Sequence, residues 1–254
     1  MKRLYTYLLS VIFIVLFLNV EGQVSIKDSS LTIPMFYGAY SYQVPLGDMA
    51  DRFGGNSAIG PGFQIKTKSN WIFGAEWDFM FGNNVKDGFS IFEEIMTDDG
   101  NIINGDGLPA VVALSERGNI FTLRFGKLFP VFSRNPNSGI HIGIGIGFMN
   151  HKIHIEVENN NAPQLVGDYK RGYDRLSSGF VISEYVGYLY MGNARVANFF
   201  AGVEFYQAFT KSRRDYIFDL MSPDNEKRLD MLIGPKVAWI IPLHRRAPQE
   251  YYLY

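Results

Sequence analysis

Residues 57–82 alternate with great regularity between two kinds of side chain. Bulky apolar residues such as Phe63 and Trp77 occupy one set of alternate positions, and glycine or charged residues such as Lys66 occupy the other. Successive side chains of a strand point to opposite faces, so this pattern predicts two strands with one aromatic face and one small or charged face. The polar residues 68–70 separate them as a turn. A single hairpin of this kind also fits a half-buried strand pair of a soluble sandwich.

The rest of the chain repeats this two-residue period and predicts eight strands in all. The predicted strands are residues 33–44, 57–67, 71–82, 120–132, 140–148, 179–191, 197–210 and 228–241. In the fifth strand, isoleucines alternate with His141 and with the glycines of 143–147, which we interpret as space for long charged side chains opposite. The phase slips near Asn150, so residues 151–156 are predicted to continue the strand beyond its apolar part.

The connections between the predicted strands alternate strictly between long and short. The long ones are 45–56, 83–118, 157–177 and 211–227, and the short ones are 68–70, 133–138 and 192–195. An even number of strands with long connections at one end and tight turns at the other is the layout of a transmembrane barrel. Each strand also has about the 9–11 residues needed to cross a bilayer with tilt. The predicted fold is therefore an all-β, eight-stranded antiparallel up-and-down transmembrane β-barrel, with a soluble lipocalin-like barrel or sandwich as the alternative.

The first residues predict export. Lys2 and Arg3 precede an apolar run over 4–20, and the small Gly22 follows, so residues 1–22 are predicted to be a signal peptide. A membrane-anchoring helix is the alternative, because the run is nearly long enough to span a bilayer. The chain has no cysteine, which excludes disulfides, thiolate chemistry and a lipid anchor on a mature N-terminal cysteine. Its net charge of −1 provides no basic surface for nucleic acid.

With these features, the chain resembles the small Gram-negative outer-membrane barrels of the OmpA transmembrane-domain and OmpX kind. It is most similar to the PorT-like outer-membrane β-barrel group, some members of which serve type IX secretion. The resemblance covers about 33–243 and rests on pattern. It implies a bacterial outer-membrane location and a monomer that contacts outer-membrane lipid and the outer-membrane insertion machinery. Tyr252 and Tyr254 match the terminal aromatic ending of such barrels, but residues 244–254 follow the last strand as a predicted periplasmic tail and include Pro248.

Charged residues fall on the face of the strands that is predicted to point into the barrel. They are Lys66, Glu76, Asp78, Arg124, Glu204, Asp230 and Lys236. Glu184 is expected to join them, although its apolar neighbours on both sides leave its face ambiguous. An eight-stranded barrel is just wide enough for its own side chains, and buried charges must pair, so this set predicts a salt-bridged plug without an open channel. The alternative is a path for ions or protons.

The segment that follows strand five carries residue types used in catalysis. His154 and Glu156 share one face of an extended strand, and His151 points to the other. Ser177 and Ser178 begin the adjacent strand six, so a Ser–His–Glu arrangement at the barrel rim is geometrically possible. Polar residues at a strand tip are more often simply solvated, and the alternation separates the two histidines as metal ligands. No catalytic residue, metal or cofactor is predicted.

The acidic, glycine-rich segment 98–106 lacks the full ligand spacing of a calcium loop, with its closing Glu, and is predicted to be a mobile loop. The predicted function is a non-enzymatic outer-membrane barrel that serves as a structural, assembly or secretion-associated component. It would act through its loops or through a periplasmic partner bound by the tail. The predicted tail contacts are Arg245, Arg246, Tyr251, Tyr252 and Tyr254. The alternatives are a lipid-modifying outer-membrane hydrolase and a surface adhesion or binding protein.

Overall fold

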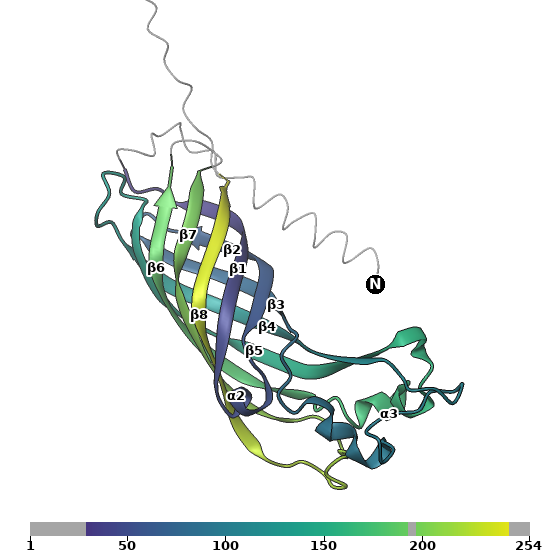
Figure 1. Ribbon diagram of the computed structural model, residues 1–254. Coiled ribbons are helices and arrows are strands. Elements are labelled where there is room, and N and C mark those ends of the chain that lie inside the picture. Colours follow the sequence, from purple (N-terminus) through teal and green to yellow (C-terminus); the bar gives the residue numbers. More distant parts are fainter. Residues whose placement is uncertain (1–28, 193–196, 244–254) are drawn as a thin grey trace, which may run out of the picture.

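The computed structural model describes residues 29–192 and 197–243, which form a closed antiparallel barrel (Figure 1). Its strands are β1 (Ile33–Gly47), β2 (Asn56–Lys66), β3 (Trp71–Gly82), β4 (Val112–Phe129), β5 (Gly139–Val157), β6 (Ser177–Met191), β7 (Asn198–Ser212) and β8 (Lys227–Pro242). Each strand pairs with the next along the chain, and β8 pairs with β1 to close the ring. The predicted eight-stranded up-and-down barrel is confirmed. The predicted signal peptide and the predicted tail lie outside the described residues.

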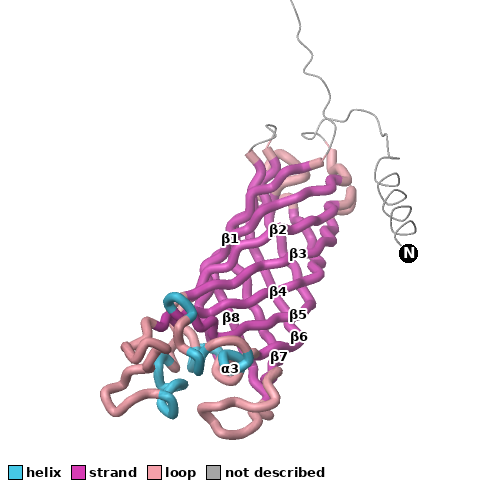
Figure 2. Tube along the Cα trace, turned by 90° about the vertical axis from the view of Figure 1, so that its right-hand side faces the viewer, coloured by secondary structure: helices cyan, strands magenta, loops and turns pink. Residues whose placement is uncertain are grey.

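Short helices occur only in the long connections within the described part of the chain, at one end of the barrel (Figure 2). They are α2 (Asp48–Arg52), the 3₁₀ helices η1 (Gly88–Ile95), η2 (Glu158–Asn160) and η3 (Pro163–Leu165), and α3 (Asp168–Arg171). No helix among the described residues is long and apolar enough to cross a membrane. The two ends of the described chain lie at the opposite end, where Ser30 donates a hydrogen bond to Asn70 in the β2–β3 turn and the Leu243 N–H donates to the Pro34 carbonyl.

The outer face of the barrel is an apolar belt. Phe121 on β4, Ile144 on β5 and Val203 on β7 are 48%, 51% and 46% exposed, and similar residues surround them on every strand. A water-soluble protein rarely exposes so large a contiguous apolar surface, whereas lipid-facing strands of a membrane barrel require one. The belt therefore defines the membrane-spanning part of the barrel.

Beyond the belt, at the end with the long connections, the polarity of the two faces reverses. On β5, Met149, Ile153 and Ile155 point inward and are fully buried, while the outward positions Asn150 and Lys152 are polar. The predicted slip of phase at Asn150 was wrong: the alternation continues without interruption through β5. The sequence pattern changes there because the strand leaves lipid, so its inner face packs on a core and its outer face meets water.

The reversal also explains why β4 begins earlier than predicted. It starts at Val112 rather than at residue 120 and pairs with β5 as far as Val112↔Val157. The two strands extend together beyond the belt, and the end with the long connections lies to one side of the barrel axis (Figure 1).

Candidate functional site

Five of the seven predicted lumen charges meet in one buried group, here called the central cluster: Glu76, Asp78, Arg124, Glu204 and Lys236. Lys236 Nζ lies 3.2 Å from Asp78 Oδ2 and 2.8 Å from Glu204 Oε2, and it also pairs with Glu76 Oε1. Arg124 Nη1 bridges Glu76 Oε1 at 2.8 Å and Glu204 Oε1 at 2.9 Å. Strands β3, β4, β7 and β8 are thereby joined across the lumen by ion pairs.

Three tyrosines also contact the charged residues of this cluster. The Tyr37 hydroxyl donates to Glu76 Oε2 at 2.7 Å, and the Tyr206 hydroxyl donates to Asp78 Oδ2 at 3.4 Å. The guanidinium carbon of Arg124 lies 4.0 Å from the centre of the Tyr185 ring, a cation–π contact. The sequence could not assign these tyrosines to the site, because it does not show which inward-facing aromatic side chains contact the charged residues.

The lumen contains little free space at the central cluster. A cavity of about 20 Å³ lies between Tyr37, Glu76, Arg124 and Lys236, which is room for about one water molecule. Apolar side chains fill the lumen toward the short-turn end, among them Met35, Leu189 and Ile240. This packing supports the interpretation of a salt-bridged plug.

The other two predicted lumen charges are buried but lie apart from the central cluster. Lys66, near the short turns, donates to Ser30 Oγ and to Asn137 Oδ1, each at 2.9 Å. Asp230 lies near the outer end and pairs with Arg52 at 2.7 Å and with His151 Nε2 at 2.9 Å. Arg52 was missed in the sequence because α2 belongs to a connection and not to a strand.

The glycines of β5 were predicted to leave space for long charged side chains on the opposite wall. They instead leave space for residues of the two neighbouring strands. A Cβ atom on Gly143 would lie 2.3 Å from the Tyr185 hydroxyl of β6 and 2.5 Å from the Phe125 carbonyl oxygen of β4. Gly143 thus lets Tyr185 lie close to the sheet, where it contacts Arg124. The same relation holds between Gly62 and Tyr37 on β2 and β1.

Glu184 does not join the lumen charges, and that expectation was wrong. It is exposed on the outer face at the middle of β6, in register with Ile144 and Phe205 of the apolar belt. Gln207 Nε2 on β7 donates to both of its carboxyl oxygens at 3.2 Å. The inward positions of β6 beside the glycines of β5 are taken instead by Val181, Ser183 and Tyr185.

Replacing this polar pair with leucines should stabilise the barrel. We expect Glu184→Leu/Gln207→Leu to raise the free energy of unfolding from lipid vesicles by about 1–2 kcal/mol, because polar groups facing lipid are unfavourable. The double change avoids leaving Gln207 without its partner. A loss of stability in denaturant titration would mean that this face does not meet lipid.

The four long connections pack together over the outer end of the barrel. We call residues 48–55, 83–111, 158–176 and 213–226 the outer loop layer. Its buried apolar residues share one core with the inward-facing residues of the strand ends. Phe53, Phe92, Tyr173 and Phe218 bring one aromatic ring from each connection.

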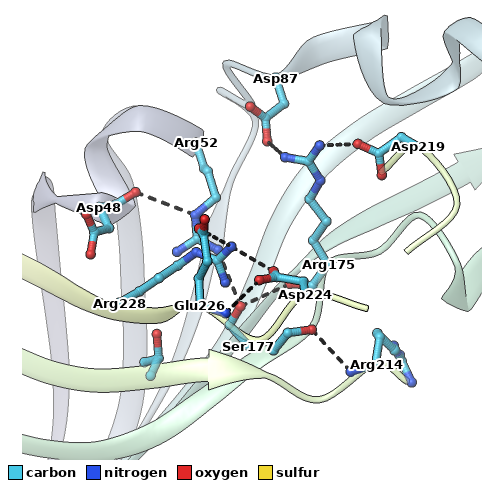
Figure 3. Close-up of polar contacts among 12 residues, drawn as sticks. Asp48, Arg52, Asp87, Arg175, Ser177, Arg214, Asp219, Asp224, Glu226 and Arg228 are labelled. Carbon is cyan, nitrogen blue, oxygen red and sulfur yellow. Dashed lines mark hydrogen bonds and ion pairs between the residues drawn. The ribbon is translucent and has the colours of Figure 1, made fainter. Parts of the chain in front are cut away.

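Ion pairs tie the connections of the outer loop layer to one another (Figure 3). Arg175 lies between Asp87, at 2.7 Å, and Asp219, so that it links three of the four connections. Arg214 makes two hydrogen bonds to Asp174, and the pKa of its guanidinium is raised chiefly by them. Loops held by a core and by several ion pairs are expected to keep one shape in water.

The residues considered for catalysis do not assemble into a catalytic site. Ser177 points inward and Ser178 outward, and Ser178 accepts a hydrogen bond from Arg213. Neither serine is hydrogen-bonded to His154 among the described residues. His151 instead faces the lumen and binds Asp230.

Within residues 29–192 and 197–243, no group of three or more His, Asp or Glu side chains is arranged to hold a metal ion. The acidic segment 98–106 forms turns in which Asn104 Oδ1 accepts the N–H groups of Asp106 and Leu108.

No protein-family model matches the chain, and no curated protein matches it at a significant level. Among solved structures, it is similar to Ail, the attachment invasion locus protein of Yersinia pestis. The two share 5% sequence identity at a TM-score of 0.43 over 82% of this chain and 99% of Ail. It is also similar to Neisserial surface protein A, with 8% identity at a TM-score of 0.40 over 81% of this chain and 96% of that chain. Similarity this low carries no information about the role of the chain.

Proposed function

We propose that the protein is a non-enzymatic barrel of the bacterial outer membrane that binds a protein partner at the cell surface through its outer loop layer. The observation that supports this most is the construction of that layer. Long connections of a barrel are ordinarily its most variable and mobile parts. Here they share a core and the Arg175 ion pairs, an arrangement that presents a surface of fixed shape.

The exposed residues of the outer loop layer suit a protein partner. Three of the four connections expose large apolar side chains to water: Phe89, Leu108, Val111, Val166, Tyr169, Tyr216, Leu220 and Met221. Exposed aromatic and aliphatic side chains on a rigid frame lose little conformational entropy when they become buried against another protein.

A second candidate is an assembly or secretion component that binds a periplasmic partner. One observation favours it: in the β4–β5 turn, at the end opposite the outer loop layer, Phe132 is 91% exposed. Docking through the tail, including Arg245 and Tyr254, stays a prediction, because those residues lie outside the described part of the chain.

Site-specific photocrosslinking on intact cells distinguishes the two candidates. A photoreactive amino acid at Leu108, which is 62% exposed, is expected to give adducts with a discrete protein, and one at Phe132 is not. Leu220 provides a second outer position. Adducts confined to Phe132 would contradict surface binding and favour the periplasmic component. Unchanged lipid composition in a deletion strain would further exclude a lipid-modifying enzyme.

A further inference from the structure

An open groove of about 500 Å³ lies on the outer wall of the barrel, across β3, β4, β5 and the start of β6. Its wall changes character along the barrel axis. Phe148, at its inner end, belongs to the apolar belt, and Phe79 on β3 is in register with Asn119. Beyond Phe148, toward the outer loop layer, the wall is formed by Asn150 and then by two cations, Arg117 and Lys152. The groove therefore crosses the outer boundary of the membrane.

The boundary is marked by a row of hydrogen-bonded polar side chains. Trp77 Nε1 donates to Asn119 Oδ1 at 3.1 Å, and Asn119 Nδ2 donates to Asn150 Oδ1 at 3.3 Å. Asn150 is in register with Ser178, whose hydroxyl accepts from Arg213 Nε at 2.6 Å. Indole and amide groups at this level are typical of the zone where lipid headgroups begin.

The charge just beyond this row is positive and is only partly balanced by the protein. Arg117 and Lys152 are directly opposite each other on adjacent strands, an unfavourable arrangement for like charges. Among the described residues Arg117 forms no ion pair, and its guanidinium donates to the Glu116 carbonyl at 2.7 Å. Lys152 lies 4.0 Å from Asp174, which is already bound by Arg214 at shorter distances. An anion between the two cations would relieve their repulsion.

We propose that this groove binds a phosphorylated lipid of the outer leaflet. Its phosphate lies between Arg117 and Lys152, its acyl chains lie along Phe79 and Phe148, and Asn150 contacts the polar part of the headgroup. A lipid fits better than a free anion, because the cations stand at the end of an apolar wall that a small ion would leave uncovered. Guanidinium and ammonium groups at a membrane surface favour anionic headgroups. The site does not depend on the outer loop layer having a protein partner.

Trp77 provides a reporter beside the groove. Trp71→Phe and Trp239→Phe leave it as the single tryptophan of the protein. This variant is folded into phosphatidylcholine vesicles that contain a fixed fraction of lipid brominated on its acyl chains, either phosphatidic acid or phosphatidylcholine. Bromine quenches indole fluorescence on contact. We expect phosphatidic acid to occupy the groove with an affinity about tenfold or more above that of phosphatidylcholine, because two cations meet its phosphate.

The double change Arg117→Gln/Lys152→Gln should make the two brominated lipids equivalent. Lys127→Gln is the matched control, since Lys127 is an outward cation near the opposite end of β4, against Trp71. It should leave the preference intact. Lys152→Gln alone, at a side chain that is 42% exposed, serves if the double variant does not fold, and should lower the preference. Equal quenching by both lipids in the starting variant, or an equal loss with Lys127→Gln, would overturn the proposal.

Discussion

Replacing Lys236 with methionine should destabilise the barrel by about 3–5 kcal/mol, because it leaves carboxylates buried without their main cation. Lys236 pairs with Glu76, Asp78 and Glu204, so its loss leaves Arg124 as the single cation of the central cluster. The measurement is denaturant unfolding from lipid vesicles, with the slope of the transition compared between variants.

The matched control for this change is Lys127→Met. Lys127 faces outward near the short turns, and its ammonium lies 4.4 Å from the centre of the Trp71 ring. Such an exposed cation–π contact is worth about 0.5–1 kcal/mol. Adding Glu204→Gln to Lys236→Met should recover part of the loss, since it removes one of the unpaired carboxylates. Equal losses at positions 236 and 127 would show that the central cluster does not hold the barrel together.

An arginine in the apolar belt should have the second-largest effect. Val203 is an outward residue of β7, in register with Val186 and Pro235. Val203→Arg places a charge at lipid depth and is expected to cost about 2–4 kcal/mol near the midplane. Vesicle refolding yields and unfolding titrations would both register this loss.

The same change from valine to arginine at a position exposed to water provides the control. Val111 is 64% exposed in the outer loop layer, and Val111→Arg should change the stability by no more than about 0.5 kcal/mol. Lumen positions such as Thr122 are less suitable, because Thr122 is only 1% exposed and an arginine there would test packing. If both valine changes cost the same, the outer face of β7 is not in lipid.

The fold was predictable because its main signal is local. Alternation of side chains assigns residues to two faces without knowledge of any partner strand. The alternation of long and short connections assigns each connection to one end of the barrel. The inward charges Glu76, Arg124 and Lys236 followed from the same rule. Their contacts did not, because which inward residues meet depends on strand tilt and register around the closed barrel.

Each failure has its own physical reason. Glu184 was expected to join the inward charges, although its apolar neighbours on both sides left its face ambiguous. The register of β6 with its neighbouring strands turns it outward. Asn150 was taken for a slip because the apolar face of β5 changes sides where the strand leaves the membrane. The role of Arg175 could not be foreseen, since its partners Asp87 and Asp219 come from connections far apart in sequence.

Labelling of single cysteines on intact cells tests the central claim most directly. The chain contains no cysteine, so one introduced thiol reports its own side of the membrane. Asp99 in the outer loop layer and Ser69 in the β2–β3 turn are both exposed, so a difference between them reflects sidedness and not burial. A membrane-impermeant maleimide should label Asp99→Cys on intact cells, and Ser69→Cys only after the outer membrane is permeabilised. Labelling of Ser69→Cys but not of Asp99→Cys on intact cells would contradict a barrel that presents its long connections outside.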